Sequence, residues 1–289
     1  MYVDPLPSNE ELLTIYRQQG STLGSELCWS GTRRHLWPVW AWALRLIRNT
    51  GSNGPLLDIG CGAGQFLNFA KKQGWQELAG IEPVSEIARM ARALTHSQIH
   101  EVDLHDTGLP SEHFAAIASW DVIEHLPRPR QAITEMWRIL RPGGLLILST
   151  PNLDGAALRF LQGKSQQVMP PEHLIYYARA TMSRLIEDAG FSVLKMRSIH
   201  IYIREWTRKL ARCDSSSQKE INTYKQWYTR LTGSSLFLGG MQVADVFLDW
   251  TNLGDCLVTV AQKSRSTSAG EDQSNVDRCR DTDPTMRHT

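Results

Sequence analysis

A glycine-rich turn between an apolar segment and a helical pattern constrains this chain more than any other feature. The run Asp58-Ile59-Gly60-Cys61-Gly62-Ala63-Gly64 follows the apolar residues Pro55-Leu56-Leu57. Three alternating glycines remove side chains from the turn, so backbone N–H groups can lie directly against a ligand. Glu82 ends the next apolar segment, and an acidic residue about 20 positions after such a turn can accept hydrogen bonds from a ribose. The pattern predicts a nucleotide-like cofactor across the ends of two parallel strands.

The spacing of the glycines separates two classes of cofactor. A dinucleotide fingerprint has the pattern G-x-G-x-x-G, and Gln65 stands here where its third glycine would be. Asp58 precedes the first glycine, and its carboxylate suits an ammonium group better than a pyrophosphate. These features favour S-adenosylmethionine, which has an amino acid end, a ribose and an adenine but no phosphate. An NAD-dependent oxidoreductase is the first alternative.

The segments after the turn alternate between strand and helix patterns. Strands are expected at Ile99–Leu104 and Phe114–Ser119. A helix with an apolar stripe from Ala132 to Leu140 follows, and Arg141-Pro142-Gly143-Gly144 ends it. Leu145–Leu148 is continuously apolar, as in a parallel strand covered on both faces. The alternation predicts a parallel, doubly wound α/β sheet.

Taken together over roughly residues 55–200, these motifs resemble the class I S-adenosylmethionine-dependent methyltransferases. The resemblance is to the branch related to ubiquinone-biosynthesis O-methyltransferases. It implies a Rossmann-like, seven-stranded α/β sheet with helices on both faces. It also implies that the last two strands form an antiparallel pair, with Cys256–Ala261 as the final strand.

The same resemblance implies a cofactor site at the carboxyl ends of the strands. The loop would hold the methionine ammonium, Glu82 the ribose hydroxyls, and Asp103 with Leu104 the adenine, while Ser119, Trp120 and Asp121 would lie beside the methyl group. The full set comprises Asp58, Gly60, Cys61, Gly62, Gly64, Glu82, Asp103, Leu104, Ser119, Trp120 and Asp121.

Two histidines are the candidate catalytic bases. His125 follows the fourth predicted strand and His173 follows the fifth. Isolated histidines more often serve structure than catalysis, but open α/β sheets bind their ligands at these strand ends. Methyl transfer is an in-line displacement in which the protein positions the reactants and supplies a base where the nucleophile needs one. We therefore expect methylation of a small molecule at a hydroxyl oxygen, assisted by histidine.

Two further alternatives remain open. Asp121, Glu124, His125 and His173 are similar in order to the metal cluster of small-RNA 2′-O-methyltransferases, although Asp121 is unusual at the first position. Such a cluster could hold Mg²⁺, Mn²⁺ or Zn²⁺ and lower the pKa of a substrate hydroxyl. A Glu-His pair is also widespread in relatives not known for a metal, so the primary prediction is a site without one. A non-catalytic S-adenosylmethionine-binding protein is the other alternative, and nothing in the sequence supports it.

The flanking segments extend this core, which we place at residues 51–263. Residues 1–50, which include Trp29, Trp37, Trp40 and Trp42, are expected to form an N-terminal helical cap. Residues 200–253 form an insertion before the last strand that suits a lid or a substrate-binding element. From Lys195 to Arg230 the chain has nine Lys and Arg residues, and Trp206, Tyr224, Trp227 and Tyr228 are interleaved with them. The polar tail 264–289 is predicted to be disordered.

Composition limits the partners and the compartment. A net charge of +1 over 289 residues argues against a protein that depends on bulk electrostatic attraction to nucleic acid. The five cysteines are scattered without a C-x-x-C pattern, which predicts reduced thiols and a cytoplasmic protein. No apolar run approaches the length of a membrane span. Peripheral membrane contact through Leu236–Met241 is an alternative to packing of that segment on the core.

Overall fold

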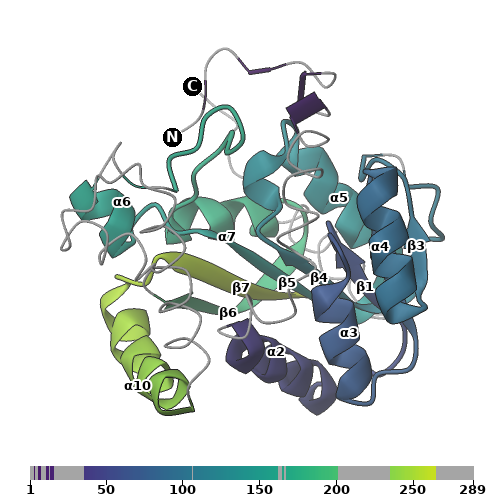
Figure 1. Cartoon of the computed structure of the whole chain (residues 1–289), viewed down its shortest axis with the longest axis horizontal. Coiled ribbons are helices and arrows are strands. Elements are labelled where there is room, and N and C mark those ends of the chain that lie inside the picture. Colours follow the sequence, from purple (N-terminus) through teal and green to yellow (C-terminus); the bar gives the residue numbers. More distant parts are fainter. Residues whose placement is uncertain are drawn as a thin grey trace, which may run out of the picture.

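A seven-stranded sheet with the order β3-β2-β1-β4-β5-β7-β6 forms the centre of the molecule (Figure 1). The computed structural model describes residues 36–105, 107–161, 165, 167–200 and 235–264, together with residues 3, 6–7, 11–12 and 14–15. Strands β1 to β5 are parallel, and β7 is antiparallel to both β5 and β6. The expected Rossmann-like sheet and its antiparallel last pair are therefore confirmed.

The parallel strands at the centre of the sheet are buried along their whole length. Every residue of β1 and β4 is buried, as expected for strands with helices on both faces. The strands are β1 Leu56–Ile59, β2 Leu78–Ile81, β3 Gln98–His100, β4 Phe114–Trp120, β5 Leu140–Pro151, β6 Phe191–Ile199 and β7 Cys256–Lys263.

Helices cover both faces of this sheet (Figure 1). Neighbouring residues of β5 face opposite layers, because strand side chains alternate. Leu145 and Ile147 pack with α2 and α3, whereas Leu146 and Leu148 pack with α5 and α7. The helices are α2 Trp37–Asn49, α3 Gln65–Lys72, α4 Ser85–Thr95, α5 Pro129–Ile139, α6 Ala156–Leu161, α7 Arg179–Glu187 and α10 Ser235–Thr251, with the 3₁₀ turn η2 Ile123–His125.

Two strands begin or end at other residues than the sequence predicted. The third strand ends at His100, so Asp103 lies in the following loop rather than on the strand. There the Asp103 carboxylate accepts the His105 backbone N–H at 2.8 Å, a local turn that competes with strand pairing. Strand β5 begins at Leu140 rather than Leu145, because Leu140 leaves α5 with an extended backbone and pairs with Phe114.

Helix α2 lies within residues 1–50, the segment expected to form an N-terminal helical cap. Helix α2 has Pro38 in its first turn and buries Trp40, Ala43, Leu44 and Ile47 against the sheet. Residues 16–35 and 201–234, which include most of the basic and aromatic part of the insertion, lie outside the described residues, as does the tail beyond 264. The proposed domain boundaries thus remain predictions. No helix in the described part of the chain is long and apolar enough to cross a membrane.

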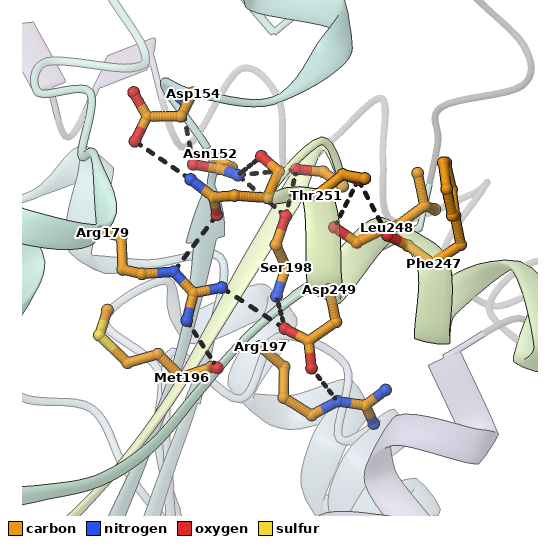
Figure 2. Close-up of polar contacts among 12 residues, drawn as sticks. Asn152, Asp154, Arg179, Met196, Arg197, Ser198, Phe247, Leu248, Asp249 and Thr251 are labelled. Carbon is orange, nitrogen blue, oxygen red and sulfur yellow. Dashed lines mark hydrogen bonds and ion pairs between the residues drawn. The ribbon is translucent and has the colours of Figure 1, made fainter.

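Helix α10 closes the edge of the sheet through two carboxylates one turn apart. Asp249 accepts the backbone N–H of Ser198 at 2.9 Å, and Asp245 accepts that of His200 at 2.7 Å. The Asp249 carboxylate also contacts Arg179 and Arg197 at 3.4 and 3.3 Å (Figure 2). Since β6 is the edge strand of the sheet, these contacts occupy N–H groups at its carboxyl end that would otherwise be unpaired.

We predict that Asp249→Ala lowers the free energy of unfolding by about 1–3 kcal/mol, because it removes the partner of one backbone N–H and two guanidinium groups. Urea unfolding measures the loss. Asp188→Ala is the control, since its ion pair with Arg130 is exposed and should be worth under about 1 kcal/mol. Equal losses in the two variants would show that α10 is not fastened through Asp249.

Candidate functional site

The three glycines of the turn after β1 have different reasons to be glycine. Gly60, Gly62 and Gly64 all have positive φ, at 67°, 51° and 81°. A Cβ atom at Gly60 would lie 2.4 Å from Val122 Cγ2, and one at Gly64 would lie 2.7 Å from Thr95 Cγ2. A Cβ atom at Gly62 would meet nothing within 4 Å. Packing therefore excludes side chains at Gly60 and Gly64, whereas Gly62 leaves its backbone open to a ligand.

Glu82 holds this turn in place. Its carboxylate accepts the Gly62 N–H at 3.1 Å through Oε2 and the Val84 N–H at 3.0 Å through Oε1. Burial raises the pKa of the Glu82 carboxyl, while the two N–H donors lower it. Each oxygen has a further lone pair, so the carboxylate can still accept a hydroxyl. The residue predicted to contact the ribose is thus also the residue that fixes the glycine turn.

A pocket opens beside the turn, with aromatic walls and two carboxylates. The rings of Trp40, Phe66 and Trp120 pack together, with centroids 5.3 Å apart for Phe66 and Trp120 and 5.6 Å apart for Trp40 and Phe66. Asp58 and Asp121 also line the pocket. Ring faces and carboxylates both attract cations, so the pocket suits a positively charged part of a ligand.

Two of these aromatic residues were not foreseen as site residues. Trp40 comes from the N-terminal helix α2, which the sequence indicated only as a cap. Phe66 lies in the first turn of α3, directly after the glycine turn, and that position was the available signal. Predicted residues Gly60, Cys61 and Gly62 do line the pocket, whereas Gly64 starts α3.

Other predicted cofactor residues lie outside this pocket. The Ser119 hydroxyl is buried and donates to the Ile59 carbonyl at 3.2 Å, so it joins β4 to β1. Asp103 is exposed in the loop after β3, and the neighbouring Leu104 is buried. Cys61, by contrast, lines the pocket. Burial, followed by the charges of Asp58 and Glu82, raises the pKa of its thiol, which is therefore inert at neutral pH.

A second polar cluster adjoins the pocket through Asp121. Glu124, His125 and His173 place one potential ligand atom each within 4.8 Å of one another. Asp121 is outside this group, since its carboxylate accepts the Ser149 hydroxyl at 2.7 Å. Asp121 has a left-handed backbone, with φ of 56°. Such strain in a non-glycine residue is common at functional sites.

Backbone carbonyls orient both histidines in the same way. His125 Nδ1 lies 2.8 Å from the Glu172 carbonyl oxygen, and His173 Nδ1 lies 2.8 Å from that of Gln167. A carbonyl only accepts hydrogen bonds, so both Nδ1 atoms carry the proton and each Nε2 carries the lone pair. The two rings are 4.7 Å apart between centroids. The cluster therefore offers two oriented imidazole lone pairs.

The electrostatics of the cluster oppose charge on all three side chains. Burial and then the neighbouring His173 lower the pKa of His125 to about 4, and burial lowers that of His173. Burial and then the Asp121 charge raise the pKa of Glu124 well above its usual range. Both Glu124 side-chain oxygens are buried, and the hydrogen bond with the Thr150 hydroxyl lowers this pKa only in part. At neutral pH both imidazoles are thus uncharged, with a single proton on Nδ1.

Comparison with known proteins identifies similar chains. The profile of a family described as "Methyltransferase domain" matches residues 32–196, more than half of the 289 residues. A probable S-adenosylmethionine-dependent methyltransferase from Mycolicibacterium smegmatis is 28% identical over 138 residues, which are 48% of this chain and 52% of that protein. A ubiquinone biosynthesis O-methyltransferase from Alkalilimnicola ehrlichii is 30% identical over 105 residues, 34% of this chain and 41% of that one. The chain spans about half the length of the curated relatives it matches.

A solved structure shares the fold at low sequence identity. A SAM-dependent methyltransferase from Thermotoga maritima superposes with a TM-score of 0.54 at 16% identity. The match covers 85% of this chain and 97% of that structure. The likeness therefore extends to the sheet and its helices as a whole.

We predict that Gly62→Ala weakens binding of S-adenosylhomocysteine at least about tenfold while costing little stability. In the ligand-free protein the added methyl group meets only open space. The free energy of unfolding should therefore fall by no more than ~1 kcal/mol, the cost of a left-handed backbone at alanine. Calorimetric titration and urea unfolding measure the two effects. Gly51→Ala is the matched control, since Gly51 also has positive φ and open surroundings.

Gly64→Ala completes the comparison. Its methyl group would collide with Thr95, so its stability should fall further than that of Gly51→Ala. Unchanged affinity in a folded Gly62→Ala protein would show that the ligand does not approach this turn.

Proposed function

Because this chain belongs to the methyltransferase-domain family, we propose that it is an S-adenosylmethionine-dependent methyltransferase that acts on a small molecule at a hydroxyl oxygen. The observation that carries the proposal is the pair of oriented, uncharged imidazoles of His125 and His173 beside an aromatic, acidic pocket. The relatives named as ubiquinone biosynthesis O-methyltransferases agree with oxygen as the acceptor atom.

The residues of the pocket fit this cofactor. Asp58 and Asp121 can attract its ammonium and sulfonium charges, and the rings of Trp40, Phe66 and Trp120 can face the same cations. The remaining lone pairs of the Glu82 carboxylate can accept the ribose hydroxyls. When bound, the cofactor supplies a methyl group on a good leaving group. The chain then has to position the acceptor and remove its proton.

A hydroxyl acceptor explains the two histidines best. Transfer to a hydroxyl oxygen releases a proton, so a nearby uncharged base assists it. The Nε2 atoms of His125 and His173 are such bases, since their Nδ1 atoms are protonated and bound to carbonyls. Their lowered pKa values keep both imidazole rings uncharged at physiological pH.

We predict that His125→Gln and His173→Gln each lower the turnover number about 10²-fold or more, because each removes a base. Transfer of labelled methyl groups from S-adenosylmethionine to a panel of phenols and catechols measures turnover. Affinity for S-adenosylhomocysteine should stay within about twofold, and the exposed His113→Gln is the control. Full turnover in both variants would eliminate histidine as the base.

The pH dependence follows from the same lowered pKa values. A base acts in its unprotonated form and is lost as the pH falls through its folded pKa. Turnover of the unmodified protein should therefore change little between about pH 8 and 6 and decline toward the His125 pKa of about 4. A decline centred at the usual histidine pKa of about 6.5 would contradict this assignment.

Metal-assisted methylation is a second candidate, and the geometry of the cluster favours it specifically. Glu124, His125 and His173 place potential ligand atoms within 4.8 Å of one another, and both Glu124 side-chain oxygens are buried. A His Nδ1–H bound to a backbone carbonyl is the usual outer contact of a metal-ligating imidazole. Mn²⁺ or Zn²⁺ suits this ligand set and would lower the pKa of a substrate hydroxyl. The cluster supports the metal without favouring an RNA acceptor over a small molecule.

If a metal is used, EDTA treatment should abolish methyl transfer and Mn²⁺ or Zn²⁺ should restore it. Titration of the stripped protein should show one site, which Glu124→Gln removes and the exposed Glu86→Gln retains. S-adenosylhomocysteine binding by Glu124→Gln confirms that this variant folds. Full activity in EDTA, with no metal bound, would leave the histidine-base mechanism alone.

A further inference from the structure

The pocket beside the glycine turn carries two carboxylates that no lining residue balances. Asp58 comes from β1 and Asp121 directly follows β4, and both line the same pocket of about 150 Å³. The other described residues that line it are aromatic, small or uncharged, with no lysine, arginine or histidine among them. Two carboxylates in so small a space repel each other, so a ligand with two positive charges fits the pocket best.

The Asp121 carboxylate is held by the neighbouring strand β5. Its Oδ1 accepts the Ser149 hydroxyl at 2.7 Å, and the same hydroxyl accepts the Asp121 backbone N–H at 3.0 Å. The Asp121 N–H also donates to the Ser149 carbonyl at 3.2 Å. These contacts hold Asp121 in its left-handed backbone, with φ of 56°. Because Ser149 is buried within β5, it gives the Asp121 carboxylate a fixed position.

The second carboxylate oxygen of Asp121 is available to a ligand. No residue in the described part of the chain donates a hydrogen bond to Oδ2, and Asp121 lines the pocket. A hydrogen bond to Oδ1 leaves the carboxylate its negative charge. Asp121 can therefore attract a cation in the pocket without first losing a partner.

The position of Asp121 assigns it to the sulfonium of the cofactor rather than to the ammonium. Burial lowers the pKa of both His125 and His173, and the Asp121 charge acts on each in the opposite direction, so Asp121 stands at the side of the pocket that adjoins the histidines. The acceptor has to lie beside its base, and the methyl group beside the acceptor. The sulfonium that carries the methyl group therefore belongs at Asp121, which leaves Asp58 for the ammonium.

We propose that Asp121, positioned by Ser149, distinguishes S-adenosylmethionine from S-adenosylhomocysteine through the charge at sulfur. Methyl transfer breaks the carbon–sulfur bond, leaves its electron pair on sulfur and forms the bond to the acceptor oxygen, whose proton passes to the histidine base. The ammonium and carboxylate of the cofactor are unchanged, but the positive charge at sulfur is lost. Attraction to Asp121 then ends, which favours exchange of the product for a new methyl donor. The assignment rests on the proposed function, because it takes the histidines as the base.

Equilibrium binding of the two ligands tests the division between the carboxylates. Calorimetry in the presence of EDTA, so that no metal contributes charge, gives the ratio of the two dissociation constants. Asp121→Asn should weaken binding of S-adenosylmethionine relative to S-adenosylhomocysteine by about fivefold or more. Asp58→Asn is the matched control. Since both ligands carry the ammonium, it should weaken both and leave the ratio within about twofold of that of the unmodified protein.

Ser149→Ala tests the positioning. It should change the ratio in the same direction as Asp121→Asn but by a smaller factor, because the carboxylate keeps its charge and loses only its support. Ser198→Ala is the control, since it also removes a buried strand hydroxyl, but on β6, and should leave the ratio unchanged. A purely structural role of Ser149 would weaken binding of both ligands alike.

Two results would overturn the proposal. The ratio could stay unchanged in an Asp121→Asn protein that still binds S-adenosylhomocysteine and is therefore folded, or Asp58→Asn could change the ratio as much as Asp121→Asn. Failure of the unmodified, folded protein to bind either ligand would contradict the proposed function itself, and the role of Asp121 with it.

Discussion

The site depends on one buried carboxylate. Glu82 directly follows β2 and accepts the N–H groups of Gly62 and Val84, so it joins the turn after β1 to the segment after β2. Both connections lie at the same edge of the sheet because the two strands are parallel. The pocket can form only if this turn stays open at Gly62, and a carboxylate accepting two N–H groups holds it there without filling the space in front of it.

The fold and the position of the glycine turn were predictable because they depend on local sequence. Alternating glycines, apolar strands and an amphipathic helix each encode their structure within a few residues, and the sheet followed from their order. Strand β3 was predicted too long because Asp103 forms a local turn that the apolar pattern does not reveal. Trp40 in the pocket could not be foreseen, since its place depends on how α2 packs across the sheet.

The arrangement of the cluster beside the pocket also depends on packing that the sequence pattern does not reveal. The order Asp121, Glu124, His125, His173 suggested four equivalent ligands, but the structure groups only the last three. Asp121 follows β4 and turns to the Ser149 hydroxyl on β5, a pairing set by strand register. Spacing in the sequence finds residues of the right chemistry, whereas the register of the sheet decides which of them meet. Three groups that all prefer to accept hydrogen bonds then require a proton or a cation between them.

The edge of the sheet imposes a different requirement, and α10 meets it in a way that determines its outer surface. An edge strand exposes N–H groups, and carboxylates one helical turn apart can occupy alternate ones. Asp249 does so at Ser198 of β6, and Asp245 does so at His200, directly after the strand. Because the side of α10 that carries these two carboxylates faces the sheet, Val246 and Trp250 on another side of the helix are exposed. The contacts that fix α10 beside β6 thus also leave these apolar side chains exposed.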